Sequence, residues 1–172
     1  DQTKKSVFKQ YDDLAKQAGG QGAQVDLNKI SSELRTVANN SVLKDNAPQV
    51  AKYAEQRAAA LSRRGFYTPE QAQEAIKIYN QSLEAFYKNP SYDTASKATI
   101  DALIVNNMRG SLDDTIEKAL EKGGYQALKG QYRALKAIEK DVANRAVVDA
   151  RKNVKGLLDF TDIFSAGQVV SG

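Results

Sequence analysis

Apolar residues recur every three to four positions along most of the chain, which is the spacing of one face of a helix. The longest such stretch covers residues 125–155 and opens with the phrase Tyr-x-Ala-Leu-Lys, repeated after seven residues. Placed on a helix, its apolar residues share one face: Leu128, Leu135, Ile138, Val142 and Ala146. We therefore predict a long helix here, against which the rest of the chain packs.

Further amphipathic patterns predict helices over residues 3–18, 47–64, 68–88 and 93–122, and one more that begins at Asp26. No stretch alternates with a period of two, so no strand is predicted. The fold class is therefore all-α: an antiparallel bundle of about five or six helices, with a long central C-terminal helix.

Local signals indicate where some of these helices begin or break. Thr68 is a predicted N-cap, and Gln71, three residues later, completes a capping box. Asp26 is a second predicted N-cap. The apolar stripe of residues 93–122 rotates by about 100° near Gly110, so we expect a kink or a break in the helix there.

The chain is predicted to divide into three parts: an N-terminal helix with a flexible linker over 1–24, a helical bundle over 25–156, and an apolar tail over 157–172. The tail concentrates large apolar side chains: Leu157, Leu158, Phe160, Ile163 and Phe164. These side chains are predicted to pack on the bundle or to dock on a partner. We expect the tail to lead into a further segment of a larger protein.

The residue types exclude several kinds of site. The 172 residues include no Cys and no His, which excludes thiol catalysis, Ser-His-Asp triads and imidazole-based proton transfer. The adjacent acids Asp12-Asp13 and Asp113-Asp114 would point about 100° apart on a helix, and we predict that they are ordinary first-turn acids or solvated acids. No apolar run reaches the length of a membrane span. We predict no catalytic, cofactor-binding or metal-binding residue, and a protein that is not an enzyme.

Positive charge concentrates in the stretch that forms the predicted long helix. Residues 125–155 carry eight basic and three acidic side chains, a larger excess than the +4 of the whole chain. The basic stripe beside the apolar face consists of Lys129, Arg133, Lys136, Lys140, Arg151 and Lys155, with Tyr125 and Tyr132 on its border. This stripe suits nucleic-acid phosphates, with base stacking on the tyrosines. The alternative, favoured because charge runs on helices are common, is a solvated face whose side-chain stems cover the core edge.

The doubled phrase also suggests a coiled-coil seam, which requires about three to four sustained heptads. The heptad pattern decays at Glu139 and Asp149. We therefore favour packing within one chain over a coiled-coil dimer.

Three segments of the chain resemble one region of large virion-associated proteins of tailed phages and prophages: TPEQAQEAIKIYNQSLEAFY, ATIDALIVNNMRGSLDDTI and ALKAIEKDVANRAVVDARKNVKGLLDFTDIFSAGQVVSG. The resemblance spans residues 68–172 and carries no catalytic motif. It implies a helical module of a multidomain phage protein, such as one delivered with DNA, and a location in the virion or the host cytoplasm.

We therefore predict a non-enzymatic scaffolding or protein-interaction module. Its partner would be another protein or the rest of the same polypeptide. Nucleic-acid binding by the basic stripe is the alternative prediction.

Overall fold

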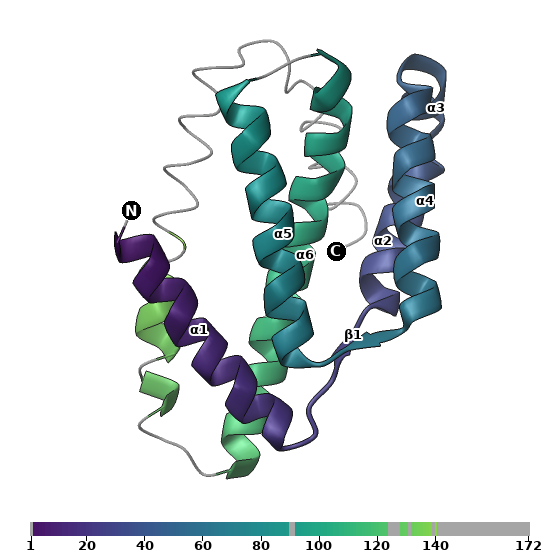
Figure 1. The fold of residues 1–172 in the computed structure, drawn as a ribbon. Coiled ribbons are helices and arrows are strands. Elements are labelled where there is room, and N and C mark those ends of the chain that lie inside the picture. Colours follow the sequence, from purple (N-terminus) through teal and green to yellow (C-terminus); the bar gives the residue numbers. More distant parts are fainter. Residues whose placement is uncertain (1, 90–91, 124–127, 131, 139, 141–172) are drawn as a thin grey trace.

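The computed structural model describes residues 2–89, 92–123, 128–130, 132–138 and 140, which form a bundle of helices (Figure 1). In chain order its elements are α1 (Gln2–Gly20), β1 (Val25–Asp26), α2 (Asn28–Ala38), α3 (Ser41–Asn46), α4 (Pro48–Arg64), β2 (Phe66–Tyr67), α5 (Pro69–Lys88) and α6 (Tyr92–Gly123). Residues 128–130, 132–138 and 140 are also helical, and the rest of the predicted long helix lies outside the described residues. The all-α bundle predicted from the sequence is confirmed.

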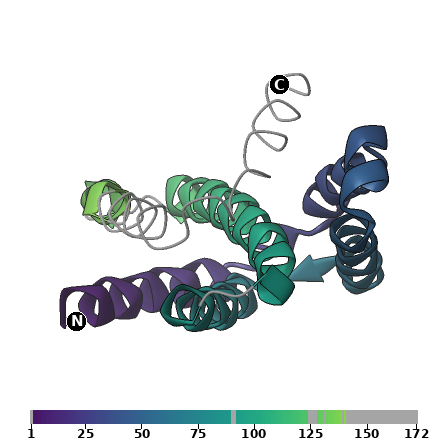
Figure 2. The ribbon, with the colours of Figure 1, turned by 90° about the horizontal axis from the view of Figure 1, so that it is seen from above.

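The helices form two groups that meet on α6. Helices α2 and α3 pack on α4, whereas α5 packs along α6 and α1 lies against both α5 and α6. Seen from above, the α2–α4 group and α1 lie on opposite sides of α6 (Figure 2). The centre of the core is formed by fully buried residues of α6: Ile100, Ile104, Met108, Leu112 and Ile116. Every helix in the described part of the chain is too short or too polar to cross a membrane.

The capping box at the start of α5 is confirmed. The backbone N–H of Gln71 donates to the Thr68 hydroxyl oxygen at 3.1 Å, and the Gln71 side-chain oxygen accepts from the Thr68 N–H at 3.0 Å. Pro69 takes the first helical position, where its missing N–H costs nothing. These bonds fix the direction in which α5 leaves the loop.

The predicted N-cap at Asp26 is wrong by one residue, because Leu27 is the N-cap of α2. Helix α2 begins at Asn28, because Asp26 lies in the short strand β1, which pairs antiparallel with β2. The Asp26 carboxylate still accepts a hydrogen bond from the Asn28 N–H at 2.9 Å. A two-residue strand is too short to produce the alternation from which strands are predicted, so β1 and β2 were both missed.

Of the kink or break expected at Gly110, the break does not occur, because α6 is helical without interruption from Tyr92 to Gly123. The rotation of its apolar stripe reflects a change of neighbour along the helix. Asp101, before Gly110, is bonded to Tyr53 of α4, whereas Arg109 lies against the ring of Tyr11 in α1. One continuous helix therefore contributes to two sides of the core.

Candidate interaction surface

The structure describes five members of the predicted basic stripe and its border: Lys129, Tyr132, Arg133, Lys136 and Lys140. Tyr125, Arg151 and Lys155 lie outside the described residues, and so do the apolar tail residues Leu157, Leu158, Phe160, Ile163 and Phe164.

Two lysines of the stripe make ion pairs with acids of α6. The Lys129 ammonium lies 3.1 Å from the Glu121 carboxylate. The Lys136 ammonium lies 3.9 Å from both the Asp113 and Glu117 carboxylates. These pairs hold the stripe against α6 and offset part of its charge, which weakens the case for phosphate binding.

Tyr132 does not have the position that base stacking requires. Its side chain is only 1% exposed and packs edge-to-face on Tyr11, with ring centroids 6.1 Å apart. On its other side, the Lys136 ammonium lies 5.6 Å from the ring centroid. Tyr132 is therefore a core residue that attaches residues 132–138 to α1 and α6.

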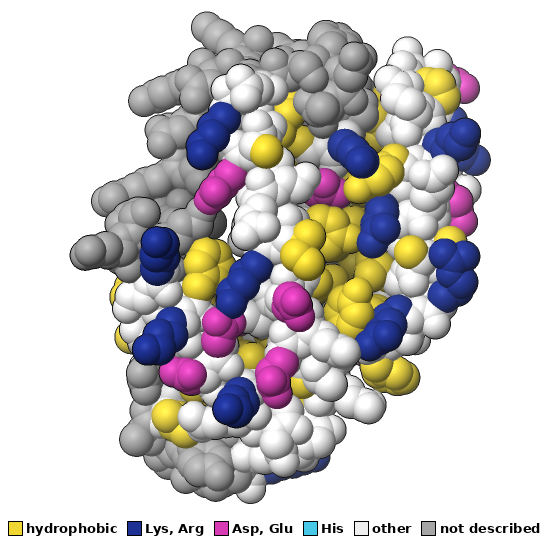
Figure 3. All heavy atoms as spheres, viewed as in Figure 1, with side chains coloured by type: hydrophobic (Ala, Val, Ile, Leu, Met, Phe, Trp, Pro, Cys, Tyr) yellow, Lys and Arg dark blue, Asp and Glu magenta, His cyan; other side chains and the backbone are white. Residues whose placement is uncertain are grey.

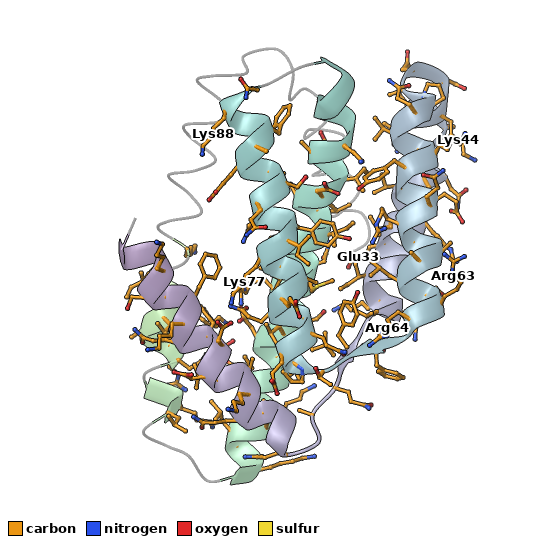
Figure 4. The ribbon with its side chains drawn as sticks, viewed as in Figure 1. Glu33, Lys44, Arg63, Arg64, Lys77 and Lys88 are labelled. Carbon is orange, nitrogen blue, oxygen red and sulfur yellow. The ribbon has the colours of Figure 1, made fainter. Side chains whose placement is uncertain are left out.

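The prediction that the paired acids are solvated is wrong for Asp113. Its side chain is buried beside Tyr132, and burial raises the pKa of both the Asp113 carboxyl and the Tyr132 hydroxyl above their ordinary values. Asp13 and Asp114 are exposed, as predicted. Asp12 pairs with Lys77 of α5 at 2.6 Å, which ties α1 to α5 (Figure 4).

A second surface, which the sequence did not indicate, lies between α4 and α5. These consecutive helices pack on α6 rather than closely on each other. Figure 3 shows a hollowed strip of hydrophobic side chains between them, with Lys and Arg side chains around it. We call it the α4–α5 groove and define it by the residues that side-chain contacts connect there, together with the exposed Ile78 of α5: Tyr53, Arg57, Arg64, Tyr67, Tyr79, Lys97, Asp101 and Ile78.

Asp101 at the bottom of the groove connects its two walls. Its side chain is 3% exposed and accepts a hydrogen bond from the Tyr53 hydroxyl of α4 at 2.7 Å. Ser82 of α5 also hydrogen-bonds to it. Burial raises the pKa of the Asp101 carboxyl, while the bonds from Tyr53 and Ser82 act in the opposite direction. The tyrosine of one wall is thus held in place through an acid of α6.

Cations lie over three tyrosine rings along the groove. The distances to the ring centroids are 5.6 Å for Lys97 over Tyr53, 5.9 Å for Arg57 over Tyr79 and 5.4 Å for Arg64 over Tyr67. All three lie within the range of a cation–π attraction. The Arg57 guanidinium also donates a hydrogen bond to the Tyr79 hydroxyl at 2.8 Å. The groove therefore combines aromatic surface with positive charge.

Ile78 adds an apolar side chain to the α5 wall. It precedes Ser82 by one helical turn, which places both on the same face of α5. Ile78 is nevertheless 60% exposed, more than any other large hydrophobic residue among the described ones. The groove thus combines one exposed aliphatic side chain with half-buried tyrosines.

The described residues offer little support for catalysis. They contain no group of three or more Asp or Glu side chains placed to hold a metal ion. A depression of about 450 Å³ beside α6 is lined by residues of both charges, among them Asp26, Asp114, Lys118 and Lys122.

Comparison with protein-family models, with curated proteins and with solved structures gives no match for this chain. The groove is therefore interpreted from its own geometry. The one signal in the sequence that could have indicated it is the four-residue spacing of Tyr53 and Arg57, which places an aromatic and a cation together on one face of α4.

Proposed function

We propose that this chain is a non-enzymatic helical module that binds another protein, as part of a larger virion-associated phage protein. The observation that carries the binding role is the α4–α5 groove, where Ile78 is 60% exposed beside half-buried tyrosines. The phage context is supported by the resemblance of residues 68–172 to virion-associated proteins.

The composition of the groove supports protein binding. Tyrosine and arginine are the residues enriched at the energetic centres of protein interfaces. Tyr53 and Tyr79 are already held by hydrogen bonds to Asp101 and from Arg57. A partner therefore loses little conformational entropy of these side chains on binding, which favours affinity.

The test is capture of partners from virion and host-cell extracts with the chain and two variants. Ile78→Asp places a charge in the groove. Val42→Asp is the matched control, because Val42 is 56% exposed on α3, away from the groove. We expect a protein that is retained by the wild type and by Val42→Asp but lost with Ile78→Asp. Equal capture by all three would contradict binding through the groove.

A further inference from the structure

We propose that the α4–α5 groove binds an acidic segment of the partner protein, with carboxylates on the α4 cations and apolar side chains on Ile78 and Tyr79. This inference rests on the proposed protein-binding function and specifies the chemistry of the partner. It follows from the charge of α4, the spacing of its arginines and the occupied tyrosine ring faces.

Helix α4 is strongly basic. It carries four basic residues, Lys52, Arg57, Arg63 and Arg64, and one acid, Glu55. Glu55 faces the other way, since its carboxylate lies 3.7 Å from Arg35 of α2. Figure 4 shows Arg63 and Arg64 at the end of α4 next to β1. The positive charge on the groove side of α4 is thus not neutralised by the acid of its own helix.

Two of these arginines form a regularly spaced pair. Arg57 and Arg64 are seven residues apart, two helical turns, so they share one face at a separation of about 10 Å along the axis. Two carboxylates seven positions apart on a partner helix have the same separation. The row therefore matches an acidic amphipathic helix laid along the groove.

Two features favour a protein over a nucleic acid. A cation of the chain already lies over one face of each of the rings of Tyr53, Tyr67 and Tyr79, so a base that stacked on that face would have to displace it. The aliphatic side chain of Ile78 can make an apolar contact with a leucine or valine, but it has no hydrogen-bond donor for a phosphate.

The test uses the full chain and a fluorescein-labelled, Ala-based helical peptide of about 14 residues, with two Glu seven positions apart and a Leu beside each. Binding is measured by fluorescence anisotropy at low salt. We expect the Arg57→Gln/Arg64→Gln variant to weaken binding about tenfold, because two ion pairs are lost. The matched control is Lys52→Gln/Arg63→Gln. It removes the same charge from α4, but from residues outside the face that carries Arg57 and Arg64, and should change the affinity less than twofold.

A second variant guards against a folding defect, because Arg57→Gln also removes the bond to Tyr79. Arg64 is exposed, so Arg64→Glu leaves the core intact. This variant should bind the Glu peptide more weakly than the wild type does. It should bind more tightly a peptide in which the Glu nearer to residue 64 is replaced by Lys. Circular dichroism at 222 nm confirms that each variant is folded.

Several outcomes would overturn the inference: no binding of the Glu peptide at millimolar concentration, equal binding of a Lys-for-Glu peptide, or equal loss with the Lys52→Gln/Arg63→Gln control. Tighter binding of a labelled oligothymidylate that competes with the peptide would make the groove a nucleic-acid surface. A further outcome is that the arginine variants still capture the partner in the extract experiment while Ile78→Asp does not. In that case the proposal of an acidic partner segment is wrong, and the proposed protein-binding function stands.

Discussion

The hydrogen bond from Tyr53 to Asp101 should contribute measurably to stability, and Tyr53→Phe removes it without changing the ring. The bond is 2.7 Å long and its acceptor is a carboxylate that is 3% exposed. Hydrogen bonds to charged groups contribute about 1.5 to 3 kcal/mol. Because Ser82 still bonds to Asp101, we expect a loss of about 2 kcal/mol, or about 4 to 8 °C in Tm for a chain of this size.

The cost of Tyr53→Phe should depend on pH. Burial raises the pKa of Asp101 above its ordinary value of 3.8, so the folded state holds the proton more tightly than the unfolded state. The contribution of Asp101 to stability therefore falls as pH rises from about 3.8 through its folded pKa. The Tyr53 hydroxyl stabilises the charged form of Asp101, so removing it makes the loss of stability with rising pH larger. We expect the cost of Tyr53→Phe to fall toward about 1 kcal/mol, the value for a neutral pair, in acid.

Urea unfolding followed by circular dichroism at pH 7 and in acid provides the free energies. The control is Tyr67→Phe, whose hydroxyl makes no hydrogen bond among the described residues, so it should change the free energy of unfolding by less than about 0.5 kcal/mol. A cost for Tyr53→Phe no greater than that of Tyr67→Phe, or one that does not change with pH, would refute the role assigned to Asp101.

Three further sets of substitutions test the fold, each by urea unfolding. Thr68→Ala should cost about 1 kcal/mol because the capping box is lost, while Thr68→Ser should retain most of that stability; equal effects would argue against the cap. Gly110→Ala should stabilise the protein by about 0.5 to 1 kcal/mol, since α6 is continuous and open space surrounds the added methyl group. Gly65→Ala should destabilise it by about 1 to 2 kcal/mol, because φ at Gly65 is +78°. A cycle with Tyr11→Leu and Tyr132→Leu should show a coupling of about 0.5 to 1.5 kcal/mol, and strictly additive effects would contradict their edge-to-face contact.

The helices that the sequence predicted most accurately are those whose signals are local. The start of α5 was predicted at the correct residue, because Thr68 and Gln71 are three positions apart and satisfy each other's backbone groups. The pairing of β1 with β2 could not be predicted in this way, since it joins Val25 to Tyr67. Its two short strands leave no periodic pattern in either segment.

The candidate site was predicted less well than the fold. Tyr132 was assigned to an exposed border of the basic stripe, but Tyr11 of the distant helix α1 covers it. Asp113 was expected to be solvated, and the same segment that carries Tyr132 buries it. Both errors arise because a helical wheel separates a polar face from an apolar one but does not say which element will pack on the boundary between them.

By itself, the sequence determined the helical class, the start of α5 and the absence of histidine and cysteine chemistry, because periodicity, caps and composition act within a few residues of one another. Only the tertiary structure decided that α4 and α5 both pack on α6 and leave a tyrosine-lined groove between them. It also brought Asp101 to Tyr53, 48 positions away along the chain. Such contacts depend on how whole helices fill the space around a shared core, which no local pattern encodes.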